Sequence, residues 1–334
     1  MEWGKKNIIQ TPHIPWVALR YYYATGDLRS LRKWYPRLVK YYRYLNESRD
    51  NGFLGLHLWA IIASFDTGLD TTSAFQKVTY GEDGERENFC YPAIFASERC
   101  RFEQSMANIA SVLQNMDDGF WNQESEITRG AMNHYLWDEK KHWYGVLHEN
   151  RSLDTRVGVD GLFPFAYALV DKERAMLAKT NFLKLIGDFG VFTVAPDEPA
   201  FEEETYWRGP AWSKSCSLAM ATARNYYPKL LARIKDGLIR FLLEYPNVWE
   251  CMSARTGKIA RGDVGIMSTP VVSSNVGAGE AIGAFLIYHG INVFSISPET
   301  GVSGRKPMAD AKSGGKIDVK SDHLKHGKQP ESDN

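Results

Sequence analysis

Apolar residues recur every three or four positions through much of the chain, which is the spacing of one face of an α-helix. The pattern first appears in residues 14–22 and is interrupted at Gly26. A second and longer amphipathic run covers 28–45, and Pro36 is its main flaw as a helix. Together the two runs predict a helical hairpin joined by a short turn.

The same spacing returns further along the chain and predicts more helices. Alternating patterns typical of strands are few, so we predict an all-α fold of repeated hairpins with about nine helices. The further helical runs are 97–116, 120–137, a shorter pair within 161–188, 216–227, 231–242 and a Gly-rich run at 276–290.

Long segments separate these helices, and their composition predicts a function. They contain Trp, Tyr, Gly and carboxylates, which disordered segments usually lack. Connections of this length are usually functional or disordered, so we expect the binding site to lie in them. The segments are 50–92, 138–160, 190–210 and 246–275.

Charge and composition exclude several classes of protein. Lys and Arg total 40, as do Asp and Glu, so there is no basic excess of the kind nucleic-acid binding requires. No apolar run reaches the roughly 18 residues of a membrane helix, and the N-terminus lacks the apolar segment of a signal peptide. We therefore expect no nucleic-acid and no membrane partner.

The four cysteines indicate a reducing compartment. They are scattered without Cys-x-x-Cys spacing, which predicts neither a disulfide scaffold nor a zinc site. No His, Cys and Asp cluster has ligand spacing, so we expect no metal and no cofactor. The cytoplasm is the expected location.

The end of the chain differs from the rest. Residues 301–334 contain no aromatic residue and are rich in Gly, Ser, Lys and Asp. Such a segment buries too little apolar surface to fold. We expect one large domain over 1–295 and a disordered tail over 296–334.

Three of the loop segments carry candidate chemistry. "FDTGLDTTSAF" at 65–75 places Asp66 and Asp70 around a glycine turn, where an isolated Asp usually caps a turn or a helix. "VWECMSARTGKIARGD" at 248–263 places Glu250 next to a tryptophan, which can desolvate the carboxyl group and raise its pKa. Alone, each carboxylate would be interpreted as an ordinary loop residue.

The third segment, "ETYWRGPAW" at 204–212, is less ordinary. Arg208 can donate paired hydrogen bonds, and Pro210 after Gly209 suits the first turn of the helix that follows. The aromatic side chains offer flat faces to a sugar, although a helix start with aromatic packing is an equal alternative. The aromatic residues are Tyr206, Trp207 and Trp212.

Together the three segments supply the parts of a glycoside hydrolase. One carboxylic acid protonates the leaving oxygen, and a second carboxylate activates water on the opposite face or attacks directly. The arginine and aromatic residues would hold the sugar.

These segments resemble glycoside hydrolase family 63 and its trehalase-like and debranching relatives. "YWRGPAW" resembles the family's Tyr-Trp-Arg-Gly-Pro-x-Trp motif, "TGLDTTSAF" resembles its acid segment and "WECMSARTGK" its base segment. "TPHIPWVALRYYYATGDLRSLRKWYPRLVKYYRY" and "YLWDEKKHWYGV" are similar to two more segments, and the order of all five matches. The resemblance covers roughly residues 10–290.

The resemblance implies an (α/α)6 toroid and an inverting mechanism. By position, Asp70 would be the general acid, two residues after Gly68, and Glu250 the general base. Arg208 and Trp207 would line the sugar subsite, and the two carboxyl groups would lie about 6.5–9.5 Å apart. The expected substrate is an α-linked glucoside or mannoside.

Two alternatives remain at this point. Relatives have several barrel helices before the first hairpin, so we expect a barrel that is incomplete at its N-terminus or completed by an oligomer or partner. That expectation, with altered motif loops, leaves open a non-catalytic sugar-binding or structural remnant. Trehalase itself ranks lower, because its Pro-Gly-Gly-Arg-Phe and Gln-Trp-Asp-Tyr-Pro segments do not occur in this sequence.

Overall fold

The computed structural model describes residues 9–51, 53–70, 72–79, 87–244, 251–258 and 260, except for the side chains of 241–244. These residues all belong to one unit of the chain, Met1–Ile296. The Gly-rich helix predicted at 276–290, the tail at 296–334 and Glu250 lie outside the described residues.

Helices dominate the described residues, as the apolar spacing predicts. Seven of them are long: α1 (Ile14–Thr25), α2 (Leu28–Asn46), α4 (Ala93–Val112), α5 (Asp118–Tyr135), α7 (Lys172–Lys184), α8 (Ser213–Tyr226) and α9 (Pro228–Glu244). Two are short: α3 (Gln76–Thr79) and α6 (Phe163–Ala166). The predicted runs outside 276–290 are therefore confirmed as helices, with ends shifted by a few residues.

The first hairpin has sequence-encoded ends. Gly26 closes α1 in the left-handed region, with φ of 71°, and donates its backbone N–H to the Tyr22 carbonyl. Asp27 caps α2 by accepting from the Ser30 amide at 3.0 Å. Pro36 does not break α2, because it lies on the exposed side, where water can satisfy the freed carbonyl group.

The apolar face predicted for α1 is largely exposed. α1 contacts α2 and α4, and its buried residues are Pro15, Ala18 and Leu19. Ile14 and Val17 instead line a surface groove together with Trp34 of α2. Periodicity identified the helix but not the side of it that the neighbouring helices cover.

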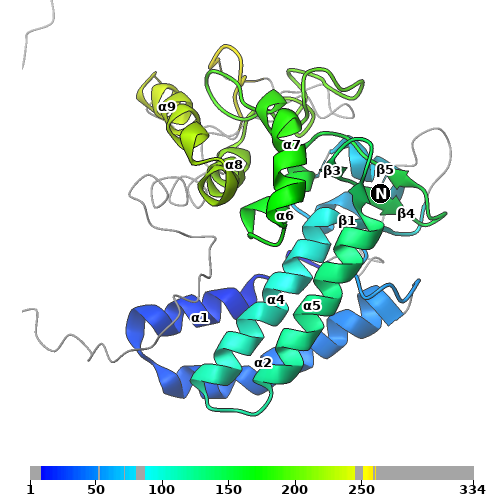
Figure 1. The fold of residues 1–334 in the computed structure, drawn as a ribbon, viewed down its shortest axis with the longest axis vertical. Coiled ribbons are helices and arrows are strands. Elements are labelled where there is room, and N and C mark those ends of the chain that lie inside the picture. The colour runs from blue at the N-terminus through cyan, green and yellow to red at the C-terminus, as the bar shows by residue number, and fades with distance from the viewer. Residues whose placement is uncertain are drawn as a thin grey trace, which may run out of the picture. The chain divides into compact units, whose positions relative to one another are not determined.

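Helix α4 lies among four other helices. It packs along α5 and also contacts α1, α2 and α6 (Figure 1). Its first eleven residues, 93–103, are all buried, so the helix has no polar face there. This burial explains why amphipathic spacing predicted a start near 97, whereas the helix begins at Ala93.

The connection after α5 forms four short strands, and a fifth lies directly before α4. β2 (Trp137–Asp138) pairs with β3 (Trp143–Tyr144), and β4 (Val146–His148) lies between β1 (Cys90–Pro92) and β5 (Leu153–Asp154). All of these pairings are antiparallel. Strands of two or three residues are too short to show alternation, which is why the sequence predicted few of them.

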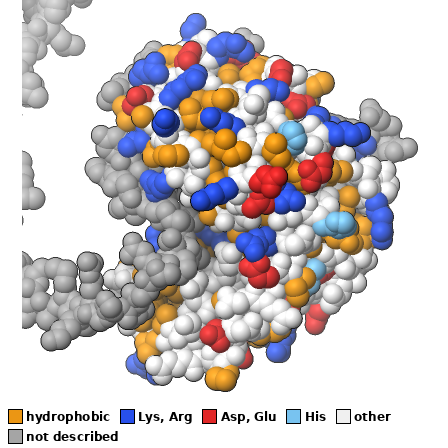
Figure 2. All heavy atoms as spheres, in the orientation of Figure 1, with side chains coloured by type: hydrophobic (Ala, Val, Ile, Leu, Met, Phe, Trp, Pro, Cys, Tyr) orange, Lys and Arg blue, Asp and Glu red, His pale blue; other side chains and the backbone are white. Residues whose placement is uncertain are grey.

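The second half of the chain continues the hairpin theme. α8 packs against α9 and α6, and the apolar residues predicted for α8 are all buried, namely Cys216, Met220, Ala223 and Tyr227. All four cysteines of the chain are buried and free. On the face drawn in Figure 2, positive and negative side chains are mixed, in keeping with their equal totals.

Candidate active site

The first aspartate of the acid segment is a structural residue. Asp66 is fully buried and accepts hydrogen bonds from the amides of Ile9 at 2.7 Å and Ile62 at 2.9 Å. Arg49 lies 3.5 Å from its carboxylate. Burial raises the pKa of Asp66, and Arg49 and the amides offset this only in part. These contacts explain why an aspartate occupies position 66 without any catalytic role.

The second aspartate follows a tight turn. Gly68 has φ of 65°, a left-handed conformation that glycine adopts without strain. The Thr67 hydroxyl accepts from the Leu69 amide at 3.0 Å and donates to the Ser64 carbonyl at 2.7 Å. Asp70 comes next and is half-buried, with its carbonyl accepting from the Ser64 hydroxyl. The glycine turn predicted for this segment is confirmed, and the Thr67 hydroxyl caps it.

The loop 202–209 folds back on itself at a glycine. A Cβ atom on Gly209 would lie 2.3 Å from the Glu202 carbonyl oxygen, so only glycine fits there. Arg208 donates to the Glu202 carboxylate at 2.8 Å. Burial acts to raise the pKa of Glu202, but the Thr205 hydroxyl and Arg208 bring it below its ordinary value. The arginine of the motif therefore stabilises its own loop.

The three aromatic residues of the motif form one cluster. Trp207 and Trp212 stack in parallel, with ring centroids 3.9 Å apart, and both are buried. Tyr206 is half-buried and packs edge-on against Trp212 at 4.6 Å. The Trp212 indole also donates to the Tyr206 carbonyl at 2.8 Å. One face of each tryptophan is thus used for aromatic packing, as the packing alternative predicted.

The helix after the motif begins later than predicted. α8 starts at Ser213, not at Pro210, because the backbone of Ala211 pairs with another segment and Trp212 is the N-cap. Ala211 donates to the Met252 carbonyl at 2.7 Å and accepts from the Met252 amide at 2.9 Å. This antiparallel bridge joins the motif to the base segment, two residues after Glu250.

A second contact strengthens that junction. The Ser253 hydroxyl donates to the Glu203 carboxylate at 3.0 Å, and the Arg255 guanidinium lies 3.5 Å from the same group. Gly257 closes the turn that follows, with φ of 72°. The proposed base, Glu250, is outside the described residues, but the segment directly after it is held against the motif.

Lys214 joins the motif to the acid segment. Its ammonium group donates to the Thr67 carbonyl at 3.3 Å and lies 5.9 Å from the ring centroids of Trp207 and Phe163. It also lies 3.4 Å from the position of a Cβ on Gly68. Lys214 was not among the predicted site residues, although it lies only two residues after Trp212, the last residue of the motif. All three predicted segments therefore meet at residues 207–214.

Solved structures identify the fold. A mannosylglycerate hydrolase of glycoside hydrolase family 63 from Thermus thermophilus, in complex with glucose, superimposes with a TM-score of 0.66 at 18% identity, covering 78% of this chain and 76% of that chain. The same hydrolase with Tris and D-glycerate gives 0.68 at 18%, covering 84% and 77%. An uncharacterized conserved protein of that organism gives 0.68 at 19%, covering 86% and 77%. The fold is that of the (α/α)6 glycosidases.

A family model then gives the particular family. The model described as the mannosylglycerate hydrolase MGH1-like glycoside hydrolase domain matches residues 2–265. This chain belongs to that family and is a glycoside hydrolase, so the predicted resemblance and fold class are confirmed. No curated protein matches the chain. Among the described residues, no helix is long and apolar enough to cross a membrane.

Proposed function

We propose that the chain is an inverting glycoside hydrolase in which Asp70 is the general acid and Glu250 the general base. The observation that carries the proposal is the junction at the motif. The Lys214 side chain contacts the acid segment at Thr67, and the Ala211 backbone bridges to the base segment at Met252. Both carboxylates thus belong to segments that are bonded to the same short stretch, residues 211–214.

The proposed reaction needs one proton transfer at each carboxyl group. Asp70 donates its proton to the glycosidic oxygen as the bond to the anomeric carbon breaks. Glu250 accepts a proton from water, and the hydroxide attacks the anomeric carbon from the opposite face. The product sugar is inverted, and the two carboxyl groups exchange protons with solvent before the next cycle.

The substrate class proposed is an α-linked glucoside or mannoside. The similar hydrolase from Thermus thermophilus is named for mannosylglycerate, so mannosylglycerate is the first compound to assay. Tyr206, Trp207, Arg208, Gly209 and Trp212 are proposed to form the sugar subsite. Because the two tryptophans stack on each other, each can offer the sugar only a ring edge or its other ring face.

Removing either proposed catalytic group tests the mechanism. Asp70→Asn and Glu250→Gln should each lower kcat on the order of 10²–10⁴-fold, the usual contribution of general acid–base catalysis. Asp197→Asn is the matched control, since this carboxylate is exposed and paired with Lys184. Proton NMR of the first turnover should show the β-anomer. Unchanged hydrolysis in both variants, or an early α-anomer, would contradict the assignment.

The second candidate is a member of this hydrolase family that binds sugar but has lost hydrolysis, because buried aromatic packing occupies much of the motif. Calorimetry against α-linked disaccharides would favour it if binding occurred without any hydrolysis in the same samples. We also propose a cytoplasmic location, which the four free and buried cysteines support.

A further inference from the structure

One tyrosine hydroxyl joins two carboxylates from different helices. Tyr42 of α2 lies 2.6 Å from an oxygen of Glu103 on α4 and 2.9 Å from an oxygen of Glu124 on α5. A hydroxyl carries one proton and donates to one acceptor at a time. In the other contact, the tyrosine oxygen and a carboxylate oxygen have no proton between them. Such a contact is stable only when a further proton or a cation lies nearby.

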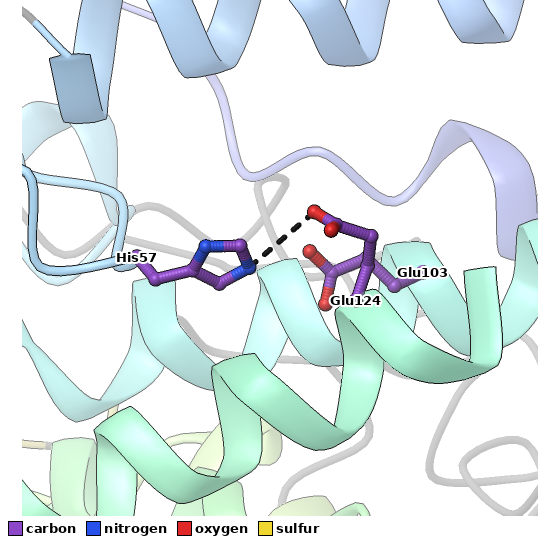
Figure 3. Close-up of side chains that lie close together, drawn as sticks. All are labelled: His57, Glu103 and Glu124. Carbon is purple, nitrogen blue, oxygen red and sulfur yellow. Dashed lines mark ion pairs between the residues drawn. The ribbon is translucent and has the colours of Figure 1, made fainter. Parts of the chain in front are cut away.

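An imidazole points at the same place. His57 Nε2 lies 3.4 Å from the Glu124 carboxylate. One ligand atom from each of His57, Glu103 and Glu124 lies within 4.8 Å of the other two. Figure 3 shows the imidazole ring and the two carboxylates converging from a loop and two helices. Sequence spacing could not reveal this group, because its members come from three separate elements.

Two of these three side chains have a buried polar atom without a hydrogen-bond partner. Glu103 is fully buried, and its second oxygen accepts no hydrogen bond. Burial raises the pKa of Glu103 to about 7, against the opposing effects of Arg99 and of the Tyr42 and Thr128 hydroxyls. His57 Nε2 is also buried without a hydrogen-bond partner. Buried polar atoms are almost always paired, so both atoms lack a partner that a bound cation would supply.

The charges around the group favour a divalent cation. Arg99 pairs with Asp50 at 2.6 Å and with Glu103 at 3.0 Å, so one guanidinium serves two carboxylates. Glu124 adds a third carboxylate. The imidazole of His57 adds a nitrogen, which is the commonest side-chain ligand for transition-metal ions. The group therefore contains three carboxyl groups and one guanidinium.

We propose that His57, Glu103 and Glu124 bind one divalent transition-metal ion of the Zn²⁺ type. One imidazole nitrogen and two carboxylate oxygens suit Zn²⁺, Mn²⁺ or Co²⁺, whereas Ca²⁺ and Mg²⁺ prefer oxygen ligands alone. The site would connect the loop carrying His57 to α4 and α5. It lies outside the motif segments of the proposed function and does not depend on that function.

The site has a route to solvent. Tyr42, Trp121 and Glu124 line a surface pocket of about 290 Å³ between α2 and α5. Glu124 is 17% exposed and His57 27% exposed, whereas Glu103 is fully buried. An ion can therefore enter from the side of Glu124 and His57, with Glu103 as the inner ligand.

Calorimetry with ZnCl₂ tests the site in the full chain after removal of metals with EDTA. We expect one Zn²⁺ bound per chain. His57→Ala and Glu124→Gln should each weaken binding by at least about tenfold, in line with the sensitivity of metal sites to their surroundings. Glu126→Gln is the matched control, because Glu126 lies on the same helix, 62% exposed, and pairs with Arg129.

Co²⁺ gives an independent readout. The wild-type protein should show a visible absorption band with Co²⁺ that is lost in His57→Ala and kept in Glu126→Gln. His57 and Glu124 are partly exposed, so their variants carry the test even if the buried Glu103→Gln variant fails to fold. Absence of Zn²⁺ binding in the wild type, or equal binding in the variants, would overturn the proposal.

Discussion

At the scale of single residues, the motif is held by a few side chains with specific partners. Gly209 is required because the Glu202 carbonyl occupies the position of a Cβ atom. Arg208 bonds to the Glu202 carboxylate across the same turn. Asp66 and Asp70 lie four residues apart, yet Asp66 is buried in structural contacts and Asp70 is half-buried. These contacts support the choice of Asp70 as the proposed acid.

Lys214 carries a prediction at this scale. Lys214→Met removes the ammonium group that bonds to Thr67, so the acid segment should lose part of its alignment with the motif. We expect kcat/KM to fall roughly tenfold and the free energy of unfolding to fall by about 1–3 kcal/mol, as for a hydrogen bond from a charged group. Enzyme assays and urea denaturation measure the two effects.

Two further variants make that measurement specific. Lys214→Arg keeps the charge and should recover much of the activity. Lys172→Met removes an exposed lysine from α7 and should change neither quantity. If Lys214→Met kept full activity, Lys214 would have no role in positioning the acid segment.

At the scale of elements, burial decided how much of each helix the sequence could predict. Amphipathic helices such as α2 were found with nearly correct ends, because one face is polar along their whole length. The first half of α4 is buried on all sides, so its start could not be predicted from periodicity. The strands between α5 and α6 are too short to form a pattern.

The sheet of β1, β4 and β5 carries a prediction about pH. His148 of β4 is buried, which opposes its protonation, but Asp154 and Glu87 outweigh this and raise its pKa. The Glu87 carboxylate lies 2.6 Å from the imidazole. Because the pKa in the folded state is raised, this stabilisation is complete below about pH 6.5 and is lost as pH rises through the folded-state value.

His148→Gln should therefore destabilise the protein most at low pH. We expect a loss of roughly 1–3 kcal/mol at pH 6, the usual size for a hydrogen bond to a charged group, and a smaller loss at pH 9. Urea midpoints at the two pH values measure it. His134→Gln, which changes an exposed histidine on α5, should show no such difference. An equal loss at both pH values would mean that packing alone explains the effect of His148.

At the scale of the whole molecule, the site is assembled from distant parts of the chain. Thr67 and Lys214 are 147 residues apart in sequence, and Ala211 meets Met252 across the α8–α9 hairpin. Residue types and their order were enough to predict the family, which the family model confirms for residues 2–265. Two expectations stay predictions. One is the disordered tail, and the other is a partner or oligomer that completes the barrel.

The tail carries a prediction at this scale. Residues 301–334 contain no aromatic side chain and little other apolar surface, so they can contribute little to a folded core. Deleting 301–334 should leave the Tm and kcat/KM unchanged. Differential scanning calorimetry and enzyme assays test this. A fall in Tm of several degrees would show that the tail packs on the folded unit.

The sequence by itself determined the hairpin pattern, the family and the three motif segments, because apolar spacing and motif order are local properties. The tertiary structure decided what depends on contacts between distant segments. It showed that Asp66 is structural, that Ala211 delays the start of α8 and that Lys214 joins two loops. Only folding brings His57 against Glu103 and Glu124, since neither spacing nor motif connects a loop to two helices.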